Sequence, residues 1–146
     1  MTRRTRAREV VLQLLYQHDQ NANMTPTDSR LFLRRRLRDD ALETWGNDLY
    51  AGVVTHRTEI DRRLAEVAEN WRIDRMAVVD RNILRLGVYE LLFQPDMPPS
   101  VAINEAVELA KRYGTEDSPA FVNGLLDRVA SSRPVTTAPA APSTEE

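Results

Sequence analysis

Residues 78–93 read VVDRNILRLGVYELLF, and this stretch decides the fold. Its apolar side chains recur at the three- and four-residue spacing of a helix, and they fall on more than one face of it. A helix that is apolar over most of its circumference is normally buried on several sides. We therefore predict a central, buried helix over residues 78–93, with the other segments packed around it.

The segment that follows is also helical. The prolines within residues 95–99 end the central helix, because proline has no amide hydrogen to donate to an interior turn. Ser100 is expected to cap a helix over residues 101–113. Gly114 stands where a left-handed C-terminal cap belongs.

A last helix begins after this turn. Ser118 is expected to be its N-cap and Pro119 its first residue, which is the usual order of these two residue types. The helical pattern continues to about residue 130. From residue 131 to residue 146 the chain is rich in Pro, Ala, Thr and Ser without apolar periodicity, which predicts a disordered tail.

Two helices are predicted near the N-terminus. The first covers residues 5–19 and ends before residues 21–26, where Asn and Pro break the pattern. The second covers residues 28–38, with Leu31 and Leu37 facing inward and arginines around them.

Residues 41–70 form the longest periodic segment. Apolar residues recur every three or four positions over nearly four heptads, which predicts one helix with a bend near Gly46. A coiled coil would also give such a stripe, but His56 and Trp45 within it and the short neighbouring helices favour a bundle. No segment alternates like a strand. The sequence thus predicts an all-α fold of about six to seven helices in one domain, residues 1–130.

Composition excludes several classes of function. The chain has 146 residues and no cysteine, so disulfides, zinc–thiolate sites and thiol catalysis are absent. His18 and His56 lack the spacing of metal ligands, and no cofactor or metal is expected. No glycine-rich phosphate loop or nucleophile motif occurs, so an enzyme is not expected. No apolar run has membrane-spanning length, so we expect a cytoplasmic protein without a membrane partner.

Charge is distributed unevenly along the chain. The net charge is -2, yet residues 1–40 hold nine Arg against five acids. Four of these arginines lie in residues 3–8 and continue into an apolar helical stripe. Cations at a helix N-terminus oppose the helix dipole, which suggests an anion supplied by a partner. The run therefore favours nucleic-acid binding over the alternative of a solvated helix end.

Other candidate residues have two interpretations. For Arg34, Arg35, Arg36 and Arg38 we favour a solvated face with Asp39 and Asp40 as counter-charges, because adjacent helical residues point in different directions. Phe121 lies in the first turn of the last helix; spacing favours a core position, whereas an exposed ring would be a platform for base stacking. Tyr16 lies at the edge of an apolar face, where it could pack or contact a partner.

Three stretches carry a more specific pattern. They are residues 6–19, with Arg6-Ala7-Arg8-Glu9, Gln13, Leu15-Tyr16 and Asp19; residues 80–91, DRNILRLGVYEL; and residues 101–127, with VAINEAVELAKRYG, Ser118 and FVNGLLD. In this order they strongly resemble the NusB family of bacterial transcription antitermination factors. The resemblance covers residues 3–129 apart from a variable region at residues 21–40.

The resemblance implies an all-helical fold of two small bundles sharing one core and a role without catalysis. Proteins of this family bind single-stranded boxA RNA together with NusE, a ribosomal protein, within the antitermination complex of RNA polymerase on ribosomal RNA operons. It also implies roles for individual residues. The matching RNA-binding positions are Arg3, Arg4, Arg6, Arg8, Lys111, Asp117, Ser118 and Phe121, and the positions expected to contact NusE are Tyr16 and Asp80.

Three other interpretations stay open at this point. The same helical domain occurs fused to RNA methyltransferases, although no cofactor-binding α/β domain follows in this sequence. A helical adaptor that binds only protein would leave the arginines solvated. A homodimer is the third alternative, and it could cover the arginine end; an elution volume that changes with added RNA would separate it from an open monomer.

Overall fold

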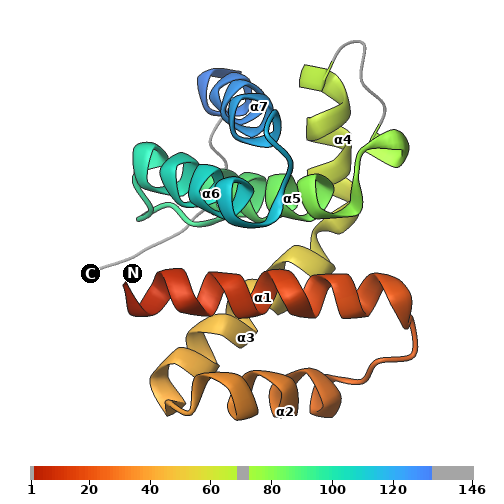
Figure 1. The fold of residues 1–146 in the computed structure, drawn as a ribbon, viewed down its shortest axis with the longest axis vertical. Helices are drawn as coiled ribbons and strands as arrows, with labels where there is room; N and C mark the ends of the chain where they lie inside the picture. The colour runs from red at the N-terminus through yellow and green to blue at the C-terminus, as the bar shows by residue number, and fades with distance from the viewer. Residues whose placement is uncertain (1, 69–72, 133–146) are drawn as a thin grey trace. The chain divides into compact units, whose positions relative to one another are not determined.

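The computed structural model of the chain describes residues 2–68 and 73–132. Within these residues it contains seven α-helices, one short 3-10 helix and no strand (Figure 1). The predicted all-α fold is confirmed. The chain divides into two compact units, residues 1–55 and residues 56–146, and each is described by itself. None of the described helices is long and apolar enough to cross a membrane.

The first unit is a three-helix bundle. It consists of α1 (Arg3–Gln20), α2 (Pro26–Leu37) and α3 (Asp40–Thr55), and each helix packs against the other two. α1 begins two residues earlier than predicted, because the hydroxyl of Thr2 accepts a hydrogen bond from the Thr5 amide at 3.0 Å and so caps the helix. The fully buried apolar side chains of this unit include Val10, Val11, Leu14, Leu33 and Val53.

α2 also begins earlier than predicted, at Pro26. The Thr25 hydroxyl accepts a hydrogen bond from the Asp28 amide at 3.1 Å, and the Asp28 carboxylate accepts one from the Thr25 amide at 3.0 Å. This reciprocal pair satisfies two amides that the first helical turn cannot satisfy. Pro26 at the first position adds a fixed φ angle to the same start.

The prediction that Leu31 faces inward is wrong. Leu31 is 39% exposed, whereas Leu33 is fully buried. Residues 31–33 are three consecutive apolar residues, so the sequence alone does not fix which of them faces the bundle. The close approach of α3 decides it, because a Cβ at Gly46 would lie 3.3 Å from Leu33 Cδ2. Ser29 and Leu33, which are four residues apart, therefore form the buried face of α2.

The predicted single helix over residues 41–70 is also wrong. The described part of this segment forms α3 and α4 (Arg57–Ala68), which are separated at His56; residues 69 and 70 lie outside the described residues. Thr55 and His56 are weak helix formers. The His56 ring stacks on the Phe93 ring with 4.3 Å between centroids. The apolar stripe continues across the break in the sequence, but its two halves are buried in different units.

The second unit is built around α5 (Val78–Phe93), whose bounds are those predicted. α4, α6 (Pro99–Tyr113) and α7 (Ser118–Ser132) pack against it, and the 3-10 helix η1 (Ile73–Arg75) contacts α4. Every residue from 82 to 91 is buried, which confirms the predicted central helix. α7 crosses α5 closely, because a Cβ at Gly87 would lie 2.6 Å from Leu126 Cδ1.

Two predicted caps of α6 are wrong. The N-cap is Pro98 and not Ser100, because Pro99 takes the first helical position and Ser100 already lies inside the helix. Gly114 ends the helix with φ -94° and ψ -165°, so it is extended and not left-handed. Glycine is required at this position for a different reason, which concerns the turn into α7.

α7 ends at Ser132, so residues 131 and 132 belong to the helix and not to the predicted tail. The prediction of disorder for residues 133–146 lies outside the described residues. The boundary of the helical domain accordingly moves from residue 130 to residue 132.

Glu43 holds α2 against α3. Its carboxylate is buried and accepts hydrogen bonds from Arg30 Nε and Arg34 Nε, each at 3.1 Å. We predicted Asp39 and Asp40 as the counter-charges of Arg34, Arg35, Arg36 and Arg38. Of these four, Arg34 binds Glu43, whose hydrogen bond raises the pKa of Arg34, with a smaller contribution from the charge of Asp40. Asp39 instead pairs with Arg3 of α1. The hydrogen bond from Arg34, followed by that from Arg30, lowers the pKa of Glu43 below its usual value.

This geometry predicts acid sensitivity of the first unit. A carboxyl group whose pKa is lowered by folding stabilises the protein fully above its unfolded pKa, and this stabilisation is lost as the pH falls through the folded pKa. We therefore expect the free energy of unfolding to fall more steeply below about pH 4.5 in the wild type than in Glu43→Gln. Urea unfolding followed by circular dichroism from neutral to acidic pH would measure it.

The matched control is Glu66→Gln. Glu66 is also paired with an arginine, Arg63, but it is 62% exposed, so the removal of this charge tests for a general effect. Identical pH slopes for the wild type and Glu43→Gln would contradict the assignment of Glu43.

Candidate nucleic-acid interface

The four arginines of the N-terminal run lie in the first two turns of α1. Three of them, Arg3, Arg4 and Arg6, are exposed, and Arg8 is only 3% exposed. The first turn contains no acid, so the positive end of the helix dipole adds to the positive charge of the side chains. The start of α1 therefore combines fixed cations with a favourable field for an anion.

Trp45 of α3 positions two of these arginines. The guanidinium carbons of Arg4 and Arg8 each lie 5.0 Å from the centroid of the Trp45 ring. This distance is within the range of a cation–π interaction. Arg4 and Arg8 are four residues apart and thus share one face of α1. In the sequence Trp45 belongs to an apolar stripe, and nothing there indicates this contact, because the two helices are far apart in the chain.

The other two arginines have acidic partners. Arg3 forms an ion pair with Asp39, which lies between α2 and α3. Arg6 lies 3.5 Å from the buried carboxylate of Glu9, and its own side chain stays 45% exposed. The structure thus brings the four predicted arginines together at one end of the first unit. The three exposed ones, Arg3, Arg4 and Arg6, are accessible to a phosphate.

The second candidate region is a cavity of about 410 Å³ in the second unit. It lies between η1, the start of α5 and the turn from α6 to α7. The carboxylate oxygen Oδ1 of Asp80 is buried there and has no hydrogen-bond partner within the described part of the chain. The lining residues are Arg75, Met76, Ala77, Asp80, Thr115, Asp117, Ser118 and Phe121.

A tight turn sets the wall of this cavity. The Ser118 hydroxyl accepts a hydrogen bond from the Thr115 amide at 2.9 Å, and the Ser118 amide donates to the Thr115 carbonyl at 3.1 Å. Ser118 was predicted as an N-cap and as an RNA contact, yet its side chain closes the turn and is 1% exposed. A Cβ at Gly114 would lie 2.5 Å from Ser118 Oγ, so the turn needs glycine there.

The remaining predicted residues divide between the two units. Asp117 is exposed and Phe121 is half-buried, and both line the cavity. Asp80, which was predicted to contact a protein partner, lines the same cavity, whereas Tyr16 belongs to the first unit, where it is 46% exposed. Lys111 is exposed on α6, pairs with Glu108 at 3.2 Å and is not a lining residue.

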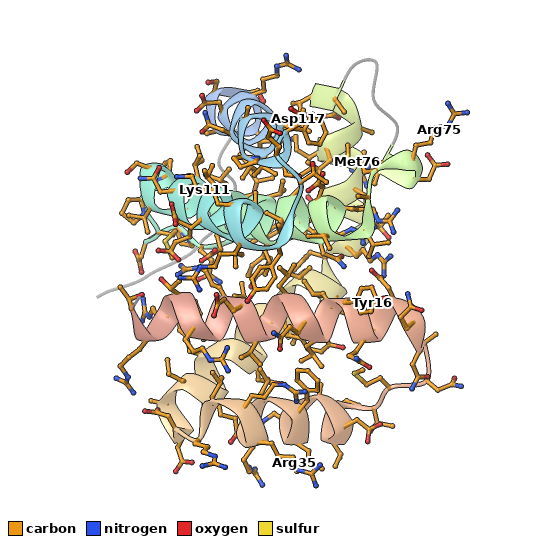
Figure 2. The ribbon with its side chains drawn as sticks, viewed as in Figure 1. Tyr16, Arg35, Arg75, Met76, Lys111 and Asp117 are labelled. Carbon is orange, nitrogen blue, oxygen red and sulfur yellow. The ribbon has the colours of Figure 1, made fainter. Side chains whose placement is uncertain are left out.

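Two residues of the cavity lining, Arg75 and Met76, could not be identified from the sequence. Figure 2 shows the Arg75 side chain extending outward from η1, with Met76 closer to Asp117. Met76 is 9% exposed and supplies an apolar wall, and Arg75 is the cation of the cavity lining. No pattern in the sequence distinguishes them, because a three-residue 3-10 helix is too short for periodicity.

The chain is similar to known proteins in both sequence and fold. A family model described as NusB matches residues 5–131. The chain is 47% identical to the transcription antitermination protein NusB of Geobacter sulfurreducens, over 92% of this chain and 98% of that relative. The structure of T. maritima NusB matches with a TM-score of 0.76 and 38% identity, over 90% of this chain and 92% of that chain. A crystal structure of antitermination factors NusB and NusE in complex with double-stranded RNA matches with a TM-score of 0.77 and 28% identity, over 90% and 98% of the two chains.

Proposed function

This chain belongs to the NusB family, and we propose that it is a transcription antitermination factor that binds boxA RNA of ribosomal RNA operons together with NusE. One observation carries the RNA-binding proposal: exposed arginines gather at the positive end of α1, where Trp45 holds Arg4 in place. Arginine suits this role because its planar guanidinium forks onto phosphate oxygens.

We assign the two regions different parts of RNA recognition. Contacts to phosphates fix the position of an RNA, and contacts to base faces and edges select its sequence. Arg3, Arg4 and Arg6 would supply phosphate contacts, with Lys111 as a further cation on α6. The half-buried ring of Phe121 would stack on an unpaired base, and Asp117 would accept a hydrogen bond from a base edge.

The protein partner would strengthen this binding. A related crystal structure contains NusB and NusE together with double-stranded RNA. Tyr16 and Asp80 are our candidates for the contact with NusE, since Tyr16 is a large exposed aromatic residue and Asp80 carries an unpartnered carboxylate oxygen within the described residues. A partner that binds both the protein and the RNA raises the affinity of each for the other by the same factor.

The proposal includes no catalytic activity and no cofactor, and it places the protein in the cytoplasm, where nascent transcripts are made. The helical domain would act within the antitermination complex of RNA polymerase. We assign no role to the residues after Ser132.

Fluorescence anisotropy of a labelled boxA RNA tests the proposal. We expect weak binding by the protein alone, tighter binding with NusE and loss of binding to a scrambled sequence. Both a single-stranded and a double-stranded form of the RNA are needed, because stacking on Phe121 requires an unpaired base. Equal binding to the scrambled RNA would show a nonspecific basic end, and no binding with or without NusE would favour an adaptor that binds only protein.

Single arginine variants test the phosphate contacts. Each phosphate neutralised on a single strand contributes roughly -0.7 to the slope of log affinity against log salt concentration. We therefore expect Arg4→Gln and Arg6→Gln each to flatten that slope by about 0.7. The matched control is Arg62→Gln, an exposed arginine of α4 in the second unit. An equal change in the control would mean that only net charge matters.

A further inference from the structure

A second group of arginines lies on α2. Residues 26–38 hold five arginines and a single acid, Asp28. Two of the arginines bind Glu43 of α3 and so have a structural role. The other three are Arg35, Arg36 and Arg38, and the described residues contain no ion pair for any of them. Part of this positive charge has a structural reason, since cations stabilise a helix C-terminus.

The end of α2 lies beside the start of α1. Arg3 of α1 forms an ion pair with Asp39, and Asp39 follows Arg38 directly in the chain. Figure 1 shows the start of α1 and the end of α2 at the same end of the three-helix unit. The two arginine groups are separated by more than twenty residues in the sequence, yet the fold places them at the same end of the three-helix unit (Figure 1).

Arg38 adopts a backbone conformation that is unfavourable for arginine. It is the C-cap of α2 with φ 53° and ψ 39°, and it is the only non-glycine residue with positive φ in the described chain. Glycine and asparagine adopt this left-handed conformation most readily. The helix dipole favours a cation near this position but does not explain arginine in place of glycine. An arginine at this position therefore costs backbone free energy, and only its side chain offers something that glycine does not.

The neighbouring arginines are exposed on the same turn. Figure 2 shows Arg35 pointing away from the helices of the first unit. Arg35 lies in the last turn of α2 and Arg38 follows the helix as its C-cap, and both residues are exposed. The guanidinium carbon of Arg36 lies 3.7 Å from the centroid of the Phe32 ring, which fixes its direction.

From this juxtaposition we propose that the phosphate-binding surface of α1 continues across Asp39 onto Arg35 and Arg38 of α2, where it binds nucleotides that flank boxA. The inference rests on the proposed function and extends it to RNA outside the recognised sequence. RNA is the partner that fits, because a strand held at the start of α1 presents its next phosphates to the adjacent arginines. Contacts to phosphates alone carry no sequence information, so the flanking bases are not selected.

RNAs of two lengths test this proposal. The short RNA is boxA alone, and the long RNAs carry an oligouridine extension on the 5′ or the 3′ side. Arg35→Gln/Arg38→Gln is expected to leave binding of the short RNA unchanged and to weaken binding of one long RNA. Between about 50 and 200 mM salt, the wild type should lose about sevenfold more affinity for that RNA than the variant, as two phosphates on a single strand require.

Two further variants sharpen the test. Arg38→Gly removes the cation while favouring the left-handed backbone, so its melting temperature should not fall although its binding of the long RNA weakens. Arg62→Gln controls for net charge. Equal affinities of the wild type and the α2 variants for both long RNAs would overturn this inference alone. A wild type that binds neither the short nor the long RNA, with or without NusE, would overturn the proposed function as well.

Discussion

Asp61→Ala is expected to lower the free energy of unfolding by about 3 kcal/mol, because it leaves a buried guanidinium without its counter-charge. Arg85 of α5 has a side chain that is only 5% exposed, and it donates from Nε and Nη2 to the two carboxylate oxygens of Asp61 at 2.8 and 2.9 Å. Its Nη1 also donates to Asn82 at 3.1 Å. The pair joins α4 to the central helix.

The two partners should respond differently. Asp61 is 28% exposed, so water can solvate its carboxylate when Arg85 is replaced. Arg85→Met, which retains the length of the side chain, is therefore expected to cost less than Asp61→Ala. The double variant Asp61→Ala/Arg85→Met should recover part of the loss, because the charge left unpaired by the first substitution is gone.

Urea unfolding monitored by circular dichroism would give these free energies. Glu66→Ala is the control, since Glu66 is 62% exposed and the loss of its pair with Arg63 at 3.4 Å should cost less than about 1 kcal/mol. If Asp61→Ala costs no more than Glu66→Ala, then the pair with Arg85 does not stabilise the second unit.

The second large effect is expected at Gly114. In Gly114→Ala the new methyl group would lie 2.5 Å from Ser118 Cβ and 2.9 Å from the Ala110 carbonyl oxygen. The oxygen belongs to the backbone and Ser118 is buried, so neither neighbour can move freely. Overpacking of this kind costs about 1–3 kcal/mol. It should also displace Asp117 and Phe121 and so weaken the binding of boxA RNA.

Gly124→Ala is the matched control for this substitution. Gly124 is an exposed residue within α7, and nothing lies within 4 Å of the position of a Cβ there. The same change should therefore stabilise the protein, by up to about 1 kcal/mol, because alanine is the better helix former. Thermal unfolding and RNA anisotropy on both variants would measure the contrast. Equal stability changes in the two variants would contradict the close contact at Gly114.

Much of the fold could be predicted from local pattern. The bounds of α5 followed from a continuous apolar run that ends in prolines, and both signals are local in the sequence. The break at His56 could not be predicted, because the apolar stripe continues unbroken while its halves are buried in separate units. The inward position of Leu33 in place of Leu31 depends on Gly46 of another helix.

The candidate site shows the same division. The arginine run was visible in the sequence because its members are adjacent. Its partners were not visible, since Trp45 belongs to α3 and Asp39 lies between α2 and α3, and neither lies at a helical spacing from the run. Ser118 was predicted as a contact by resemblance, and its burial in the turn emerged only from the fold.

The stacking of Arg4 on Trp45 bears on the entropy of RNA binding. A long flexible side chain that becomes immobile on binding loses conformational freedom worth about 0.5–1.5 kcal/mol. The guanidinium carbon of Arg4 lies over the indole ring, 5.0 Å from its centroid, through contacts within the protein itself. Part of this cost is thus met when the first unit folds. Arg4 would therefore lose less conformational entropy on binding a phosphate than an unrestrained arginine, and its contact would contribute more to the affinity.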